Sequence, residues 1–395
     1  MYSAMVNLIL LSVCIPSAII WLIILLLPIR WRMSEWWETT NDLHTSISKW
    51  PSLSVIVPAR NERASLPLTL PSWLEQDYQA SEIVIIDDQS NDGTAKYASD
   101  SAARSNRMVR ILNGSTPPPG WTGKLWALEQ GVRSSSGEWL LFTDADILHR
   151  PNLWRGLMAK ALTEQRAMVS LMALLDTTGM WARLLIPAFV YFFHLLYPFG
   201  RVKDPHSSIS AAAGGCILIS RHTLDKIGGI AGYCNAWIDD IALAKQIKRA
   251  GFLVSLALTR SAISIRPYRQ LQDVWRMVAR TAFSQLRRSW LSLMGTVLGL
   301  TVIFLAPIGG IFGFFTGTVS SWTAILSCIT LLMMATTYTP TLRFFNLSLY
   351  RAFILPFTGV LYVAMTISSA INHLLGQYEW IGARTEIVTN DHDAN

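Results

Sequence analysis

Residues 8–28 form the segment that most constrains the fold of this chain. The run, LILLSVCIPSAIIWLIILLLP, contains no charged side chain and is long enough to cross the roughly 30 Å hydrocarbon core of a bilayer. A cleavable signal peptide is the alternative. The residues before the run carry no positive charge, however, and no small-x-small cleavage site follows it. We therefore expect a membrane anchor.

Three more apolar segments lie near the C-terminus, at about 293–316, 322–340 and 352–375. They help to make 51% of the 395 residues hydrophobic, with a mean hydropathy of +0.33, which is too apolar for an ordinary soluble enzyme. The sequence therefore predicts five parts: a transmembrane anchor over 1–30, a juxtamembrane linker against the membrane surface over 31–50, a globular domain over 51–290, transmembrane helices over 291–376 and a polar tail over 377–395.

The basic residues predict the orientation of the chain, whose formal net charge is +7. Arg30 and Arg32 follow the first span, and Arg287 and Arg288 precede the second, so the positive-inside rule places these segments in the cytoplasm. We expect a multi-pass protein of the inner (cytoplasmic) membrane, with the globular domain facing the cytoplasm. The basic surplus fits anionic lipid head groups. No basic run with interleaved aromatic residues indicates a nucleic-acid partner, and no protein partner is indicated.

The four cysteines, Cys14, Cys216, Cys234 and Cys328, are far apart in the sequence. Because they show neither a CxxC pattern nor Cys/His ligand spacing, they indicate neither a zinc site nor a disulfide framework. We expect them to be reduced.

Short apolar runs alternate with helical segments in the globular part. The predicted strands are LSVIV (53–57), EIVII (82–86), MVRIL (108–112) and EWLLFTD (138–144), and the helical stretch 123–134 precedes the fourth. This alternation predicts an α/β fold, with a largely parallel sheet covered by helices on both faces. Ligands of such sheets bind at the carboxyl ends of the strands.

Polar side chains follow three of the four predicted strands. They are Arg60 and Glu62 after the first strand, which stops at Pro58; Asp87 and Asp88 after the second; and Asp144 and Asp146 after the fourth. Adjacent carboxylates such as Asp87 and Asp88 repel each other and are costly to desolvate. A positive group or several hydrogen-bond donors should therefore lie nearby.

Asp144-Ala145-Asp146 is the candidate metal motif. Side chains alternate along an extended segment, so both carboxylates should point to one side. Mg²⁺ and Mn²⁺ commonly take one or two carboxylates and complete their shell with substrate phosphates. Such a motif also occurs in ordinary surface loops, but its position beside two other polar strand ends favours a metal site.

Two later segments carry further candidates. Gly214 and Gly215 precede the strand-like run ILIS, where paired glycines allow either a tight turn or the close approach of a ligand. Asp239 and Asp240 open a helical stretch, where an aspartate is a favoured cap. One aspartate suffices as a cap, so the second, Asp240, is a candidate general base.

Basic residues supply candidate phosphate ligands. Arg280, Gln285 and Arg288 lie on a predicted helix just before the second span, where membrane anchoring alone explains Arg288. Arg280 could clamp phosphates, and so could Lys124. The segment around Lys124 lacks the frame of a phosphate-binding P-loop, because no Ser or Thr follows the lysine.

Residues 181–200 are apolar but interrupted by Arg183, Pro187, His194 and Pro198. Two interpretations stay open: an interfacial or re-entrant segment where a lipid could enter, and a buried core helix of the globular domain.

Four segments together resemble the family 2 glycosyltransferases, which have a GT-A fold. They are SVIVPARNE (54–62), VIIDDQSNDGT (84–94), FTDADI (142–147) and WIDDIALAKQIKRAGF (237–252). With the stretch PPPGWTGKLWALEQG and the C-terminal spans, the chain looks most like the hopene-associated (HpnB-type) glycosyltransferases, with the ceramide glucosyltransferase-like enzymes as neighbours.

The resemblance implies roles for the candidate residues. Pro58, Arg60, Glu62, Asp87, Asp88, Lys124 and Asp144 would bind the nucleotide-sugar, Asp144 and Asp146 the metal, and Gly214, Gly215, Arg280, Gln285 and Arg288 the diphosphate or acceptor. Asp240 would be the catalytic base, supported by Asp239. Processive members carry Gln-x-x-Arg-Trp near the membrane. This chain has an extra residue between Gln285 and Trp290, which disfavours a polysaccharide synthase. Trp380 to Arg384 is similar to a Trp-x-Gly-Arg tail element of lipid glycosyltransferases.

The sequence therefore predicts a membrane-bound inverting hexosyltransferase that uses Mg²⁺ or Mn²⁺. The donor would be a nucleotide-diphosphate-sugar and the acceptor a lipid hydroxyl, with a hopanoid suggested by the resemblance. The alternatives are a metal-dependent nucleotidyltransferase, which does not explain Asp239 and Asp240, and a catalytically inactive lipid-binding protein.

Overall fold

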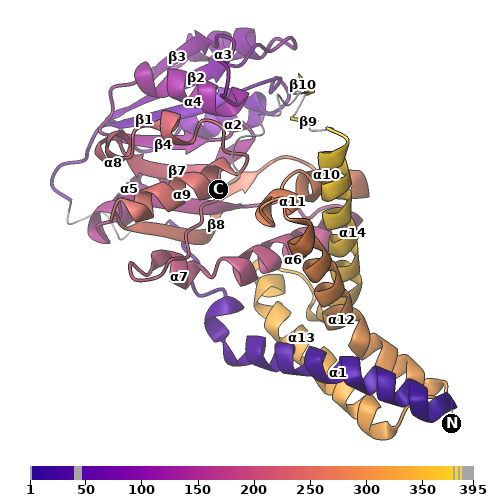
Figure 1. Ribbon diagram of the computed structural model, residues 1–395. Coiled ribbons are helices and arrows are strands. Elements are labelled where there is room, and N and C mark those ends of the chain that lie inside the picture. Colours follow the sequence, from indigo (N-terminus) through magenta and orange to yellow (C-terminus); the bar gives the residue numbers. More distant parts are fainter. Residues whose placement is uncertain (1, 40–46, 377–378, 381–382, 385–395) are drawn as a thin grey trace. The chain divides into compact units, whose positions relative to one another are not determined.

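The computed structural model describes residues 2–39, 47–376, 379–380 and 383–384 (Figure 1). The chain divides into two compact units. The membrane unit comprises Met1–Arg32, Thr177–Phe192 and Tyr268–Asn395, and the sheet unit comprises Met33–Asp176 and Phe193–Pro267.

The described part of the sheet unit is built on an eight-stranded sheet, with strand order β3-β2-β1-β4-β7-β6-β8-β5 (Figure 1). The strands are β1 (Leu53–Ala59), β2 (Ser81–Asp87), β3 (Met108–Asn113), β4 (Trp139–Thr143), β5 (Ile147–His149), β6 (Met168–Leu174), β7 (Cys216–Ser220) and β8 (Val254–Ser264). The four predicted strands are present. The sheet is largely parallel, as predicted, but it is mixed, because β7 runs antiparallel to both β4 and β6, and β5 runs antiparallel to β8.

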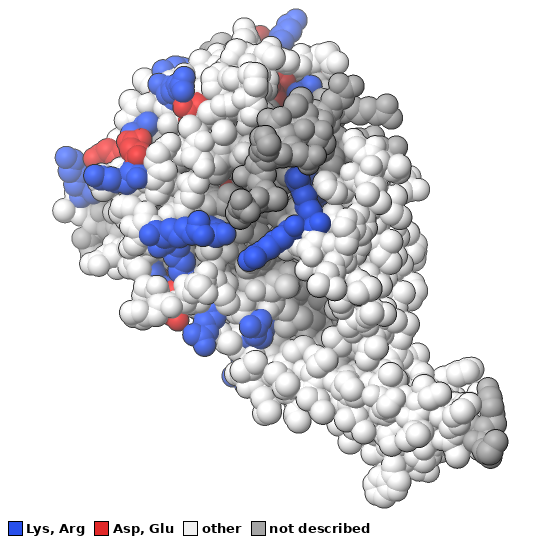
Figure 2. Space-filling model, in the orientation of Figure 1, with Lys and Arg blue, Asp and Glu red and all other residues white. Residues whose placement is uncertain are grey.

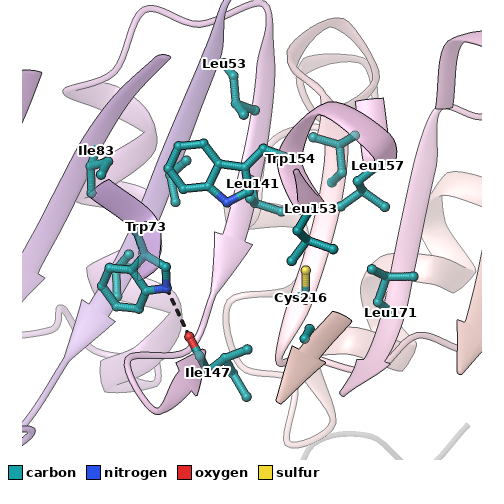
Figure 3. Close-up of a cluster of buried hydrophobic side chains, with 14 of the residues drawn as sticks. Leu53, Trp73, Ile83, Leu141, Ile147, Leu153, Trp154, Leu157, Leu171 and Cys216 are labelled. Atoms are coloured by element: carbon teal, nitrogen blue, oxygen red, sulfur yellow. Dashed lines mark hydrogen bonds between the residues drawn. The ribbon is translucent and has the colours of Figure 1, made fainter. Parts of the chain in front are cut away.

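Helices cover both faces of this sheet, as the near-continuous burial of β1 and β2 requires. One apolar cluster joins alternate strand residues to the helices α2 (Leu66–Leu74), α3 (Thr94–Ala102) and α5 (Leu153–Thr163) (Figure 3). On the opposite face lies α4 (Gly123–Arg133), where a Cβ on Gly131 would come within 2.5 Å of Ile56 Cγ2.

A glycine at the amino-terminal edge of the sheet gives a test of this packing. Gly137 N–H donates to Ser54 Oγ at 2.7 Å, and a Cβ on Gly137 would lie 2.5 Å from the backbone nitrogen of Ser54. Because backbone cannot move aside as a side chain can, Gly137→Ala should destabilise the protein by about 1–3 kcal/mol. Thermal unfolding would measure it. Gly295→Ala is the control, since no atom lies within 4 Å of its Cβ position, and an equal loss there would refute the steric explanation.

Residues 35–39, expected to lie against the membrane surface, are bound to the sheet. Leu258 N–H donates to Glu35 O, and Trp37 N–H donates to Leu258 O, both at 2.9 Å. The Glu38 carboxylate accepts from Arg260 N–H at 2.7 Å and from Ser261 Oγ at 2.5 Å. The segment thus extends the sheet beside β8.

The membrane unit contains long apolar helices: α1 (Tyr2–Leu26), α12 (Trp290–Phe315), α13 (Ser321–Phe344) and α14 (Leu355–Leu374). Among the described residues, four segments are long and apolar enough to cross a membrane: Ser3–Leu26, Trp290–Phe315, Ser321–Phe344 and Leu349–Leu374. They coincide with the four predicted spans. Their surface on the drawn face is almost free of charged side chains (Figure 2). Most of the predicted polar tail lies outside the described residues.

The segment 181–200 forms helix α6 (Met180–Leu196) and then begins α7 (Phe199–Lys203). In the membrane unit, Tyr362 of α14 donates its hydroxyl to Leu185 O at 2.9 Å, and the Tyr191 and Thr337 hydroxyls are 2.7 Å apart. The first part of α6 is therefore buried, but among long apolar helices rather than in the core of the globular domain.

Candidate active site

The sheet topology brings the polar strand ends together at one edge. Ala59 at the end of β1 pairs with Asp87, and Asp88 N–H donates to Ala59 O at 2.8 Å. On the other side of β1, Thr143 at the end of β4 pairs with Cys216 at the start of antiparallel β7. This pairing delivers Gly214 and Gly215 to the same edge.

Lys124 lies between two carboxylates at this edge. It is the second residue of α4, and its Nζ lies 2.9 Å from Asp144 Oδ1 and 3.6 Å from Asp239 Oδ2. Burial alone would lower the pKa of Lys124, but the charges of Asp144 and Asp239 outweigh it and raise that pKa. The side chain thus stays an ammonium ion between carboxylates from two separate elements.

Asp240 is a buried carboxylate held by two backbone N–H groups. It lies in the first turn of α9 (Asp239–Arg249), with Oδ2 accepting from Gly214 N–H at 2.9 Å and Oδ1 from Ile241 N–H at 2.8 Å. Burial, followed by the neighbouring charge of Asp239, raises the pKa of Asp240 to about 7, while Lys124 opposes the rise. Asp240, the aspartate that a helix cap does not require, therefore holds a proton more tightly than an ordinary aspartate.

The glycine pair contributes backbone groups rather than unusual dihedral angles. Neither Gly214 nor Gly215 has a positive φ. A Cβ on Gly214 would make ordinary contacts, 3.4 Å from Lys124 Nζ and 3.6 Å from Asp240 Oδ2. What the pair supplies is the Gly214 N–H for Asp240 and the Gly215 carbonyl, which accepts from Asp144 N–H at 3.3 Å.

Arg60 is the positive group expected beside the paired aspartates. Its Nη1 lies 3.5 Å from Asp88 Oδ2. Burial raises the pKa of Asp88, and Arg60 opposes this. Asp87 Oδ2 accepts from Ser90 N–H at 3.3 Å, whereas Asp87 Oδ1 is buried without a hydrogen-bond partner among the described residues. This corner can accept hydrogen bonds from a polar ligand.

Asp146 belongs to a second group, with Glu62 and Arg266. The segment Asp144–Asp146 is a turn, not the extended segment expected, because Ile147 N–H donates to Asp144 O at 3.1 Å. Burial, then the charges of Asp144 and Glu62, raise the pKa of Asp146 to about 7, and Arg266 opposes them. The burial of Glu62 likewise raises the pKa of that carboxyl.

These carboxylates fit a divalent cation only together with a substrate. Within the parts of the chain that the structure describes, no three His, Cys, Asp or Glu residues are grouped as a metal site. Asp144 and Asp146 can supply two ligands, and phosphate oxygens of a substrate would have to supply others. The surplus negative charge around Asp146 is what a bound cation would offset.

A small cavity in the sheet unit joins these groups. Its polar lining residues are Lys124, Thr143, Asp144, Gly214, Asp239 and Asp240. Its other lining residues are Pro58, Leu125, Leu128, Phe142, Ile217, Tyr233 and Leu243. Asp88 lies just beyond it, because a Cβ on Gly123 would be 3.1 Å from Asp88 Oδ2.

Sequence reasoning missed Arg266 and Tyr233. Arg266 follows the end of β8, so looking for polar residues directly after each strand could have found it. Tyr233, 4% exposed, lies in the short helix η3 (Ile230–Tyr233), where no sequence pattern marks it. Arg280, Gln285 and Arg288 belong to the membrane unit, and their roles stay predictions.

Comparisons with known proteins agree with this architecture. Residues 54–228 match the model of glycosyl transferase family 2. A mannosyltransferase from Pyrobaculum calidifontis, solved with GDP-Man and Mn²⁺, has a similar structure, with a TM-score of 0.57 and 18% identity. The similarity covers 95% of this chain and 99% of that one. The predicted GT-A fold is confirmed.

Curated relatives match over shorter segments. A 4,4'-diaponeurosporenoate glycosyltransferase of Staphylococcus haemolyticus is 40% identical over 96 residues, 24% of each chain. An undecaprenyl-phosphate 4-deoxy-4-formamido-L-arabinose transferase of Aeromonas hydrophila is 31% identical over 103 residues, 25% of this chain and 30% of the relative. The matches thus span about a quarter to a third of these relatives. Together with the family match, they support a family 2 glycosyltransferase domain.

Proposed function

We propose that this chain is a membrane-bound inverting glycosyltransferase, which moves a sugar from a nucleotide-diphosphate-sugar to the hydroxyl group of a lipid. The observation that carries the proposal is the buried Asp240 carboxylate, fixed by Gly214 N–H in a cavity that also contains Lys124 and Asp144. In a GT-A domain this arrangement supplies a base beside a lysine that can bind a phosphate group.

The donor would lie along the edge formed by β1, β2 and β4. Asp88, with Asp87 in support, accepts hydrogen bonds from the nucleobase and ribose, and the Arg60 guanidinium opposes the rise in the pKa of Asp88 that burial causes. Pro58 and Glu62 line the same strand end. Lys124 binds the diphosphate. Asp144 and Asp146 would hold Mg²⁺ or Mn²⁺, which when bound offsets the charge of the diphosphate leaving group.

Asp240 performs the proton transfer. As the acceptor oxygen forms its bond to the anomeric carbon, the hydroxyl proton passes to Asp240 and the bond from that carbon to the diphosphate breaks. A single displacement inverts the anomeric configuration and needs no nucleophilic side chain. Positioned proton transfer of this kind typically contributes about 10²–10⁴-fold to the rate.

The acceptor proposal rests on the membrane unit and on the relatives. The long apolar helices suit a substrate that stays in the bilayer. Relatives are named for transfer to 4,4'-diaponeurosporenoate and undecaprenyl phosphate. Within this class, a hopanoid follows from the resemblance to the hopene-associated enzymes. The positive-inside pattern supports an inner-membrane protein whose sheet unit faces the cytoplasm.

Nucleotide release from a panel of sugar nucleotides tests the proposal. The detergent-purified full chain would be assayed with Mg²⁺ or Mn²⁺ and a hopanoid or sterol-like alcohol. We expect metal-dependent, acceptor-stimulated release from one donor, and its loss in Asp144→Ala. Asp225→Asn, an exposed aspartate on α8 (Arg221–Lys226), is the matched control. A folded protein that binds no sugar nucleotide would refute the proposal.

A further inference from the structure

Buried side chains that the proposed chemistry does not use hold the turn carrying Asp144 and Asp146. Thr69 Oγ1 donates to Ala145 O at 2.8 Å, and Trp73 Nε1 donates to Ile147 O at 3.0 Å (Figure 3). Thr69 and Trp73 lie on α2 and are fully buried. The backbone of the turn is thus fixed from the side of the apolar core.

His149, also buried, is held in a single tautomer by its partners. The indole N–H of Trp154 can only donate, and it lies 2.8 Å from His149 Nδ1, so Nδ1 must be the unprotonated nitrogen. Burial lowers the pKa of His149 to about 3, so the ring is neutral and Nε2 carries its proton. Nε2 lies 3.1 Å from Thr143 Oγ1 and therefore donates to that hydroxyl.

The donor and the acceptor of each remaining hydrogen bond follow from the bond between Trp154 and His149. Thr143 Oγ1, having accepted from His149, donates to the Gly215 carbonyl at 3.1 Å. The same carbonyl accepts from Asp144 N–H, and the preceding residue, Gly214, donates its N–H to Asp240. A directed chain therefore runs from Trp154 through His149 and Thr143 to the Gly215 carbonyl, and the adjacent residue, Gly214, holds Asp240 through its own N–H.

We propose that His149 is a positioning residue, which sets the candidate metal ligand Asp144 and the candidate base Asp240 in one fixed arrangement through Thr143 and Gly215. The inference rests on the proposed function and names a residue that acts through others. A histidine that merely filled the core would need its volume but not the directions of its hydrogen bonds. Mutating a residue that orients a metal ligand typically lowers metal affinity or activity by about 10–100-fold.

The test measures Mn²⁺ binding rather than turnover. Free Mn²⁺ would be followed by electron paramagnetic resonance during titration of the detergent-purified full chain, with GDP or UDP present. We expect His149→Phe, which removes both bonds, to weaken Mn²⁺ binding at least 10-fold. We expect His149→Gln, whose amide can accept from Trp154 and donate to Thr143, to stay within about threefold of the wild type.

Glu82→Gln is the matched control. Glu82 is 6% exposed and centres a buried polar network at the opposite edge of the sheet, accepting from Ser54 Oγ at 2.6 Å and Ser136 N–H at 2.7 Å. It should lower the melting temperature without changing Mn²⁺ affinity. Equal weakening in Glu82→Gln and His149→Phe would mean a merely structural role and overturn the inference. So would unchanged affinity in His149→Phe.

A milder variant covers the case in which His149→Phe does not fold. Trp154→Phe removes only the donor to Nδ1, so we expect the Nδ1-protonated tautomer to appear in the imidazole ¹⁵N spectrum together with weaker Mn²⁺ binding. A single unchanged tautomer with unchanged affinity would overturn the inference. A wild-type protein that binds neither Mn²⁺ nor nucleotide would instead refute the proposed function itself.

Discussion

Replacing Asp240 by asparagine is expected to abolish most turnover while leaving the donor bound. The amide cannot take the acceptor proton, so kcat should fall by about 10²–10⁴-fold. Its oxygen can still accept from Gly214 N–H, so the local fold should survive. Nucleotide release measures kcat, and fluorescence or calorimetric titration measures donor affinity. Asp225→Asn should change neither quantity.

The assignment of Asp240 as the general base also predicts how kcat/KM depends on pH. A general base works only when deprotonated, and burial raises the pKa of Asp240 to about 7. The wild-type kcat/KM should therefore be low at pH 5, rise tenfold per pH unit below the inflection and level off above about pH 7. The residual activity of Asp240→Asn should lack this inflection. An unchanged profile in the variant would assign the titrating group to another residue.

Replacing Lys124 by methionine is expected to cost both stability and donor binding. The change leaves Asp144, Asp239 and Asp240 close together without their shared ammonium group. We expect a loss of about 2 kcal/mol, less than the roughly 3–5 kcal/mol of a fully buried pair, because Asp144 is 37% exposed and partly screened. In a domain of this size that loss lowers the melting temperature by roughly 4–8 °C.

The pH dependence of this stability loss, together with two further variants, distinguishes the loss of the Lys124 charge from the loss of its packing. Lys124 lowers the pKa of Asp240, so without it Asp240 should titrate at higher pH, its protonation favours the folded state and the deficit should shrink as the pH falls towards 5. Lys124→Arg keeps the charge and should retain most of the stability. Lys226→Met, at an exposed position of α8, is the matched control. A deficit that does not change with pH would indicate lost packing instead of lost charge.

The parallel half of the sheet was predictable because its strands are short apolar runs, of which β2 has the clearest β-branched run. Ile83 to Ile86 are all buried, and such a run has few alternatives to a strand covered on both faces. The antiparallel insertion of β7 was not predictable, because its partners β4 and β6 are chosen by a long connection whose path leaves no mark on local sequence. The docking of residues 35–39 on β8 was missed for a similar reason, since it depends on long-range contacts of Glu38.

In the candidate site, the expectation that ligands bind at the carboxyl ends of the strands drew attention to some of the residues but not to all of them. The structure places Arg60, which follows β1, beside Asp88, and it brings Asp144, which follows β4, to the same edge of the sheet as Asp88. Sequence reasoning could not pair Lys124 with Asp239, because their helices, α4 and α9, are far apart in the chain and are brought together only by the fold, in which η3 packs against both. His149 follows Asp146 by three residues, but its role depends on Trp154 and Thr143, and hydrogen-bond direction is not visible in a sequence.

The connection between β6 and β7 can change in length without disturbing the strands that it joins. The two strands are antiparallel neighbours, so residues 175–212 leave and return at one edge whatever their number. The Ser170 hydroxyl bonds both the N–H and the carbonyl of Ala213, at 2.8 and 3.1 Å, and so clamps the returning end. The excursion is not a free loop, because α6 within it is held by Tyr362 and Thr337. Its two ends are nevertheless fixed by the pairing of β6 with β7, so a change in its length would leave the strand ends that carry the candidate site in register.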